Sequence, residues 1–147
     1  MDRDVASRLI RDYVDGWREC DRAKILGTLD PDCVVIECYG PVYRGTGRIG
    51  EWIDAWFSEG NTVDSWEITS LLAGGTGVAI EWQFACTWHG AASAFEGASV
   101  ARFRGSGIIY LREYATTVQL YNWEGCTATR RAASRRRSRR RGRMGWA

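Results

Sequence analysis

Hydrophobic residues in the first sixty positions recur at helical spacing. An amphipathic helix of about four turns is predicted near the N-terminus, because apolar side chains there repeat every three or four residues with charges between them. These are Val5, Leu9, Ile10, Tyr13, Val14 and Trp17. A second such series predicts a helix that ends at Gly60. It consists of Ile49, Trp52, Ile53, Trp56 and Phe57. Between the two helices, Asp21 can cap a short helix that carries Ile25, Leu26 and Leu29.

The period then changes from 3.6 to 2. Asp30-Pro31-Asp32 should break the short helix, and 33–39 should follow as a strand before a Gly/Pro loop. Four longer strands are predicted at 62–73, 78–88, 94–104 and 108–117, separated by glycine-containing turns. Helices followed by a strand meander indicate an α+β fold, with the helices on one face of a curved antiparallel sheet.

The faces of the strands suggest where the core lies. On 78–88, the large apolar face should point at the helices; it consists of Ile80, Trp82, Phe84, Cys86 and Trp88. On 94–104, one face is large at both ends and small in the middle; it consists of Phe95, Gly97, Ser99, Ala101 and Phe103. Small residues opposite helices leave a hollow, which either holds a ligand or is filled by tryptophan side chains.

The alternate face of these strands is small and mixed in polarity, so a second layer should cover its apolar part. We assign to it Ala79, Glu81, Gln83, Ala85, Thr87, Ala98, Val100, Ile109 and Leu111. A homodimer formed through this outer face is therefore expected.

Charge divides the chain into two parts. Residues 126–147 contain nine arginines and no acid, whereas 1–125 contain 18 acidic and 11 basic residues, a net charge of −7. We therefore expect one domain at 1–125 and an Arg-rich tail at 126–147. The tail could contact phosphates of nucleic acid, but its composition breaks abruptly from that of the domain and it has almost no apolar residues to bury, which favours a non-functional or weakly basic extension.

The five cysteines are odd in number and form no CxxC pair, which favours free thiols in a reducing compartment. The N-terminus is charged and amphipathic, unlike a signal peptide or a membrane span. A cytoplasmic protein is the expectation. A single histidine, His89, and the lack of clustered metal ligands or nucleotide-binding motifs predict no metal and no cofactor.

One carboxylate stands in an otherwise apolar strand. Glu37 follows Val34-Val35-Ile36, and burying an ionised carboxylate without a partner is expensive. Three interpretations remain open: a base or water activator in a cavity, a structural partner of Arg112, or a solvated acid at the end of the strand.

The order of elements and several short motifs resemble the nuclear transport factor 2-like superfamily, most closely its SnoaL-like polyketide cyclase and ketosteroid isomerase branch. The motifs are Cys20-Asp21, "LDPDCVVIECYG", "YRGTGRIGEWI", "EWQFACTW", "FEGASVARFRGSG" and "IIYLREY", within residues 3–124. The resemblance implies a conical, cystatin-like α+β barrel with a pocket between the helices and the concave sheet. It also implies a dimer through the outer sheet face.

The resemblance further implies roles for individual residues. Ketosteroid isomerases use a carboxylate base on the first strand and an oxyanion hole made of a tyrosine and an acid. Alignment places Glu37 at the base, Tyr13 at the tyrosine and Ser99 at the acid, where a hydroxyl cannot replace the acidic donor. A steroid isomerase is therefore disfavoured. The same alignment brings Trp82, Phe84, Cys86 and Arg112 to the pocket.

Arg112 lies between Tyr110 and Tyr114 on one strand face. If that face is interior, Arg112 is a buried cation that needs an acid, and Glu37 is the best candidate. Arg112 could therefore either anchor a substrate or form a structural ion pair. A carboxylate–arginine pair is also similar to limonene epoxide hydrolases, although their full acid–arginine–acid set is not evident. Trp17, Trp56 and Trp82 are expected as core aromatics that also form the cavity wall.

Two functions follow. The first is a cofactor-free isomerase, cyclase or hydrolase for a hydrophobic compound, with Glu37 as the base and Tyr13, Ser99 and Arg112 as its partners. The second is a non-catalytic ligand-binding or dimerisation module. His89 is expected to be an exposed turn residue, with a role as general base as the alternative.

Overall fold

A computed structural model describes residues 2–75 and 77–123 of the chain. The chain divides into two compact units, 1–117 and 118–147. The second unit is described only at 118–123, where it has no helix or strand. The boundary expected at 125/126 and the Arg-rich tail lie outside the described residues.

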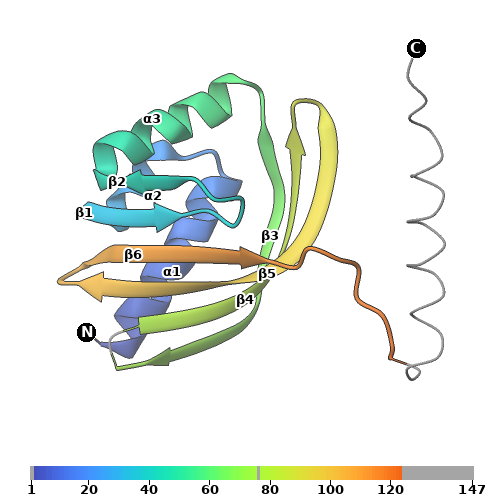
Figure 1. Ribbon diagram of the computed structural model, residues 1–147. Coiled ribbons are helices and arrows are strands. Elements are labelled where there is room, and N and C mark those ends of the chain that lie inside the picture. Colours follow the sequence, from blue (N-terminus) through green and yellow to red (C-terminus); the bar gives the residue numbers. More distant parts are fainter. Residues whose placement is uncertain (1, 76, 124–147) are drawn as a thin grey trace, which may run out of the picture. The chain divides into compact units, whose positions relative to one another are not determined.

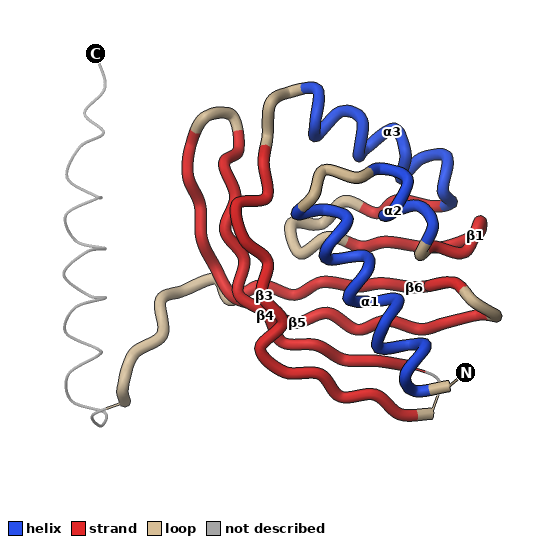
Figure 2. The backbone as a smooth tube through the Cα atoms, turned by 180° about the vertical axis from the view of Figure 1, so that it is seen from behind, coloured by secondary structure: helices blue, strands red, loops and turns tan. Residues whose placement is uncertain are grey.

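The first unit contains three helices and six strands (Figure 1). They are α1 (Arg3–Arg18), α2 (Arg22–Gly27), β1 (Leu29–Ile36), β2 (Val42–Arg44), α3 (Gly45–Ser58), β3 (Thr62–Gly74), β4 (Gly77–Trp88), β5 (Ala91–Arg104) and β6 (Gly107–Ala115). The helices pack on one side of the sheet, with α1 lying across it (Figure 2). The predicted α+β class is confirmed. None of the described helices is long and apolar enough to cross a lipid bilayer.

The sheet has the order β2-β1-β6-β5-β4-β3. Strands β3 to β6 form the expected antiparallel meander. The sheet is nevertheless mixed, because β1 runs parallel to β6, and the short strand β2 replaces part of the predicted Gly/Pro loop. Two register shifts in β3 accompany a strong bend, so that the β4–β5 turn rises toward the C-terminal end of α3 (Figure 1). Shifts of this kind increase local twist and bending.

Local sequence signals place the ends of the helices. The Asp21 side chain accepts a 2.9 Å hydrogen bond from the backbone N–H of Lys24, which confirms the predicted cap of α2. Gly60 has a φ of 75°, a left-handed conformation that suits glycine and ends α3 where expected.

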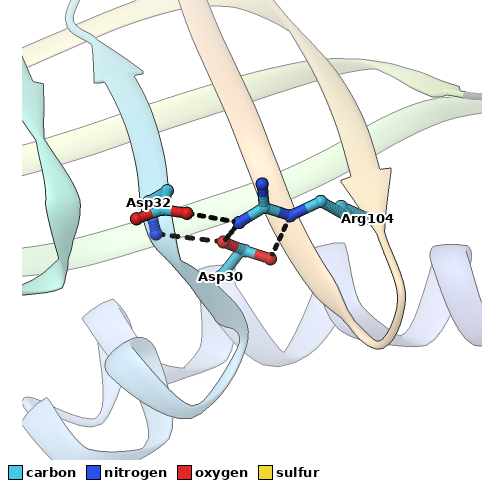
Figure 3. A network of polar contacts seen from close by, with 3 residues as sticks. All are labelled: Asp30, Asp32 and Arg104. Carbon is cyan, nitrogen blue, oxygen red and sulfur yellow. Dashed lines mark hydrogen bonds and ion pairs between the residues drawn. The ribbon is translucent and has the colours of Figure 1, made fainter.

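Strand β1 begins earlier than predicted. Asp30-Pro31-Asp32 lies inside the strand, at a register shift between Leu29 and Val34. Arg104, at the end of β5, holds this segment (Figure 3). Its guanidinium donates to both carboxylate oxygens of Asp30 and, over 2.7 Å, to Asp32. These long-range ion pairs compensate for the irregular strand pairing that proline imposes.

Trp82 fills the hollow expected over the small residues of β5. Trp82 pairs with Gly97 across β4 and β5, and a Cβ atom on Gly97 would lie within 2.5 Å of the Trp82 ring. The indole Nε1 of Trp82 donates a 2.8 Å hydrogen bond to the hydroxyl of Ser99, which is buried. The interior around Trp82 and Ser99 is therefore filled by side chains. A cavity lies farther along the bent strands β3 to β5.

Candidate functional site

A pocket of about 720 Å³ lies between α3, the β1–β2 segment and the bent strands. Cavities of 300–1,000 Å³ are typical of small-molecule sites. Aromatic side chains dominate its wall: Tyr39, Tyr43, Trp52, Trp56, Trp66, Trp82, Phe84, Trp88 and Phe95. The remaining lining residues are Glu37, Cys38, Pro41, Ala55, Glu59, Cys86, His89, Ser93 and Glu113. The pocket therefore combines a large apolar surface with a few ionisable groups.

The aromatic side chains of the pocket wall pack against one another, which fixes the shape of the wall. Trp66 lies 5.3 Å from Phe84 and 6.0 Å from Trp82, ring centre to ring centre, in T-shaped pairs. Tyr43 stacks on Trp52 with a centroid distance of 4.4 Å. Such pairs stabilise one another beyond the burial of their area. A ligand therefore meets a preformed apolar surface.

Glu37 is the first carboxyl group of the pocket. It follows the last residue of β1 and points to the interior, two positions after Val35, which is fully buried. Burial raises the pKa of Glu37. The Tyr43 hydroxyl donates a 2.9 Å hydrogen bond to Glu37 Oε2 and acts in the opposite direction, since it stabilises the carboxylate.

Glu113 is the second carboxyl group, and sequence reasoning missed it. Ile36 pairs with Arg112 between the parallel strands β1 and β6, so the next residues, Glu37 and Glu113, are neighbours across the sheet. Adjacent strands lie about 4.8 Å apart. Burial, and then the nearby charge of Glu37, raise the pKa of Glu113 to about 8. Glu113 therefore keeps its proton at neutral pH.

A smaller chamber of about 50 Å³ adjoins the pocket and shares both carboxyl groups with it. Tyr13, Trp17, Trp56 and Trp66 also line it. Their hydroxyl and indole N–H groups are buried without a hydrogen-bond partner among the described residues. Burial, together with the charge of Glu113, raises the pKa of Tyr13 well above its usual range. These four groups form a cluster of donors beside the two carboxyl groups.

The structure places the other candidate residues in two groups. Trp56, Trp82, Phe84 and Cys86 line the main pocket, whereas Tyr13 and Trp17 line the chamber. Ser99 is 2% exposed and bonds to Trp82 instead of lining either space. We expected Ser99 to act as a partner of Glu37, but it is a core residue instead.

The expected inward direction of Arg112, Tyr110 and Tyr114 is wrong. Leu111 is 1% exposed and pairs with the buried residues Val35 and Ala101, so from Tyr110 onward the odd-numbered residues of β6 point inward and the even-numbered ones outward. Before the register shift in this strand, the even-numbered Ile108 is the buried residue. Leu111 likewise does not belong to the outer face, where we expected it. The alternation of Leu111, Glu113 and Ala115 is the sequence signal for Glu113, but by itself it is compatible with either face of the strand.

Arg112 is exposed and forms no ion pair with a described carboxylate. Its guanidinium lies 4.8 Å from the centre of the Tyr114 ring, in a shallow groove that Glu37 and Glu113 also border. The predicted Glu37–Arg112 pair is therefore replaced by the Glu37–Tyr43 hydrogen bond.

The remaining polar groups of the pocket offer less reactive chemistry. Cys38 and Cys86 are free thiols, and burial raises the pKa of both, that of Cys38 to about 11. The nucleophilic thiolate form is thus disfavoured. Within 2–75 and 77–123, no three His, Cys, Asp or Glu side chains gather as a metal site would require. His89 lies in the β4–β5 turn with a φ of 48° and is exposed, as predicted.

The arrangement can perform acid–base chemistry. Two carboxyl groups whose environments separate their pKa values supply a base and an acid in one place. Here Glu37 is held toward the carboxylate by Tyr43, and Glu113 is held in the protonated form. Because the two groups interact, their proton losses belong to the pair as a whole.

Comparison with known proteins places this fold in a family. Many solved structures share it, among them the following three. The LEH-like epoxide hydrolase of Mycobacterium tuberculosis has a TM-score of 0.70 at 18% identity, over 77% of this chain and 84% of that chain. A putative polyketide cyclase from Xanthomonas campestris has a TM-score of 0.64 at 18% identity, over 82% and 92%.

The third structure is a hypothetical protein with a ketosteroid isomerase-like fold from Catenulispora acidiphila, in complex with trimethylamine. Its TM-score is 0.65 at 18% identity, over 74% of this chain and 85% of that chain. No curated protein matches the sequence. Residues 10–111 match the SnoaL-like domain, which is most of the chain. The protein is a member of the SnoaL-like domain family.

Proposed function

We propose that this protein is a cofactor-free acid–base enzyme for a hydrophobic small molecule, with Glu37 as the base and Glu113 as the acid. The observation that carries the proposal is the pair of inward carboxyl groups on neighbouring parallel strands, one hydrogen-bonded by Tyr43 and the other buried, which raises its pKa to about 8. The aromatic wall supports a largely apolar substrate.

An isomerisation or aldol-type cyclisation uses these groups directly. The Glu37 carboxylate removes a proton from a carbon next to a carbonyl group, and negative charge develops on the carbonyl oxygen. The Glu113 carboxyl and the Tyr13 hydroxyl, which line the same chamber as Glu37, would donate hydrogen bonds to that oxygen. A protonated carboxyl group in an apolar site is an effective donor for such an oxyanion. In an isomerisation, Glu37 then returns the proton to another carbon.

Hydrolysis of an epoxide is the second candidate reaction, and the donor-lined chamber favours it. A chamber of about 50 Å³ has room for a water molecule, whose oxygen can accept from the tyrosine and indole groups while it donates to Glu37. Glu37 would take a proton from this water as its oxygen attacks an epoxide carbon. The carbon–oxygen bond breaks, and Glu113 gives its proton to the leaving oxygen.

A screen of small hydrophobic ketones, lactones and epoxides tests the proposal. Against any compound that is turned over, Glu37→Gln should reduce turnover about 100-fold or more, as loss of a general base does. Glu113→Gln should also reduce it, because an amide cannot release a proton. Glu81→Gln is the matched control, since Glu81 is exposed on β4 and lines neither space. Unchanged turnover in Glu37→Gln contradicts the catalytic role.

A non-catalytic binding module remains the alternative function. It is supported if compounds bind, as read by tryptophan fluorescence, while the wild-type protein converts none of them. The aromatic wall suits such binding without requiring a reaction.

We further propose that the protein acts in the cytoplasm as a homodimer through the outer face of the sheet. Val100 and Tyr114 on this face are 39% and 48% exposed, and a second copy would cover them. Light scattering at micromolar concentration tests this assembly, and a monomer there would contradict it.

A further inference from the structure

The main pocket follows one side of α3. Trp52, Ala55, Trp56 and Glu59 line it at positions i, i+3, i+4 and i+7, which share a helix face. With a rise of about 1.5 Å per residue, the positions of Trp52 and Glu59 are roughly 10 Å apart. Trp52 stacks on Tyr43 and so marks the end that contains Glu37. Glu59 marks the other end of this helix face, about two turns from Trp52.

A buried asparagine organises this second end. Asn61 is 2% exposed, and its side-chain oxygen accepts a 2.8 Å hydrogen bond from the backbone N–H of His89. Its amide nitrogen lies 3.2 Å from Glu59 Oε2 and donates to it. The β4–β5 turn is thereby tied to the end of α3, and the Glu59 carboxylate is held at the pocket wall.

The electrostatics of this end favour positive charge. The described residues of the pocket wall include Glu37, Glu59 and Glu113 but no lysine or arginine. Glu59 is also the C-cap of α3, where the helix dipole has its negative end. His89 Nε2 lies 3.7 Å from Glu59 Oε2, too long for a hydrogen bond, and the Glu59 side chain is half exposed.

Two tryptophans of the pocket wall lie near Glu59 along the chain or beside its neighbour His89. Trp56 precedes it by one helical turn, and Trp88 neighbours His89 at the end of β4, with their ring centres 4.8 Å apart. Both tryptophans line the pocket, and Trp88 is 54% exposed. Indole rings attract cations through their negative faces, and proteins use this attraction to recognise substituted ammonium groups.

We propose that the Glu59 end of the pocket is a subsite for a substituted ammonium group, so that the ligand is an apolar molecule with a cationic end. The inference rests on the proposed function in so far as the same pocket binds the ligand, but it requires no particular reaction. An anionic group would face glutamates and a helix C-terminus. A neutral apolar group would offer no opposite charge to the Glu59 carboxylate, which Asn61 keeps at the pocket wall.

A pair of probes with the same shape tests the charge requirement. Benzyltrimethylammonium carries the cation, and neopentylbenzene is its neutral isostere. Titration followed by tryptophan fluorescence and calorimetry should show about tenfold or greater preference for the cation, and added salt should weaken it. Equal affinities, or no binding of the cation, overturn the inference.

Variants locate the subsite. Glu59→Gln should weaken the cation about tenfold and leave the isostere unchanged. Glu51→Gln is the matched control on the same helix, because Glu51 is exposed, pairs with Arg48 and lies outside the pocket wall. It should leave both affinities unchanged. His89→Asn removes the imidazole near Glu59, while asparagine tolerates the positive φ, so the cation preference should persist.

Loss of the cation preference in His89→Asn, an unchanged preference in Glu59→Gln, or equal weakening of both probes in Glu59→Gln overturns the subsite. These outcomes differ from failure of the proposed function. The catalytic role is read separately, from the turnover of neutral substrates by the Glu37→Gln variant.

Discussion

The Tyr43 hydroxyl donates a 2.9 Å hydrogen bond to Oε2 of Glu37, and this contact joins the edge strand β2 to the end of β1. It is the one hydrogen bond that the structure records at the Glu37 carboxylate among the described residues. Burial disfavours the charged form of Glu37, and Tyr43 counteracts this effect. The strength of Glu37 as a base therefore depends on Tyr43.

Tyr43→Phe should raise the pKa of Glu37, because the hydrogen bond from Tyr43 stabilises the carboxylate and phenylalanine cannot donate one. Carbon-13 NMR of the side-chain carboxyl groups measures this shift without a substrate. With a substrate, the acidic limb of the pH–rate profile should move to higher pH. The phenylalanine ring retains the stacking on Trp52, so stability should change little.

Glu113 should make the wild-type protein less stable at alkaline pH. Its pKa is about 8 in the folded state and about 4.5 in the unfolded chain, so the folded state binds more protons between these values. The free energy of unfolding should therefore fall as the pH rises from about 4.5 to 8.

In Glu113→Gln this fall should be smaller by an amount on the order of a few kcal/mol, since one pKa unit corresponds to about 1.4 kcal/mol. Urea unfolding at pH 5, 7 and 9 measures the difference. Parallel pH profiles of the two proteins would show that Glu113 is ionised in the folded state.

Ser99 should be a structural residue that supports Trp82. Ser99→Ala leaves the buried indole N–H of Trp82 without an acceptor, which should destabilise the protein by about 1–3 kcal/mol. Ser65→Ala, at an exposed position of β3, is the control and should have little effect. Adding Trp82→Phe to Ser99→Ala should give a non-additive result in urea unfolding, because the unpartnered donor is then absent. Full additivity would argue against the bond.

The ion pairs of Arg104 should stabilise the start of β1 in a pH-dependent way (Figure 3). Hydrogen bonds from Arg104 lower the pKa of Asp30 below its usual range. Its stabilising contribution is present above the unfolded pKa of about 3.9 and disappears as the pH falls through the lowered folded value.

Asp30→Asn should therefore lower the Tm at pH 7, and the difference from wild type should close under acid conditions. Asp32→Asn should have a smaller effect, because the Asp32 side chain is 76% exposed and makes a single contact with Arg104. Thermal unfolding followed by circular dichroism compares the variants. A larger decrease in Tm for Asp32→Asn than for Asp30→Asn would contradict the prediction that Asp30 is the more important partner of Arg104.

The sequence by itself determined the elements that local physics controls. Helical spacing, the Asp21 cap and Gly60 located the helices, and period-two patterns located β3 to β6. Glu37 was found because a carboxylate in an apolar strand conflicts with burial unless a cavity or partner receives it. The α+β class followed from the order of these elements. That order and the short motifs together resembled the SnoaL-like family, and the match over residues 10–111 confirms the family.

Only the tertiary structure decided which side chains meet Glu37. The parallel pairing of β1 with β6 sets Ile36 opposite Arg112, which turns Glu113 inward and Arg112 outward. A one-residue difference in the assigned face reverses every side chain of a strand, and the local pattern of β6 was compatible with either choice. Tyr43 was missed because β2 has three residues, too few for a periodic signal, and exists through pairing with β1. The partners of a buried acid depend on contacts between strands distant in sequence, and no local preference encodes them.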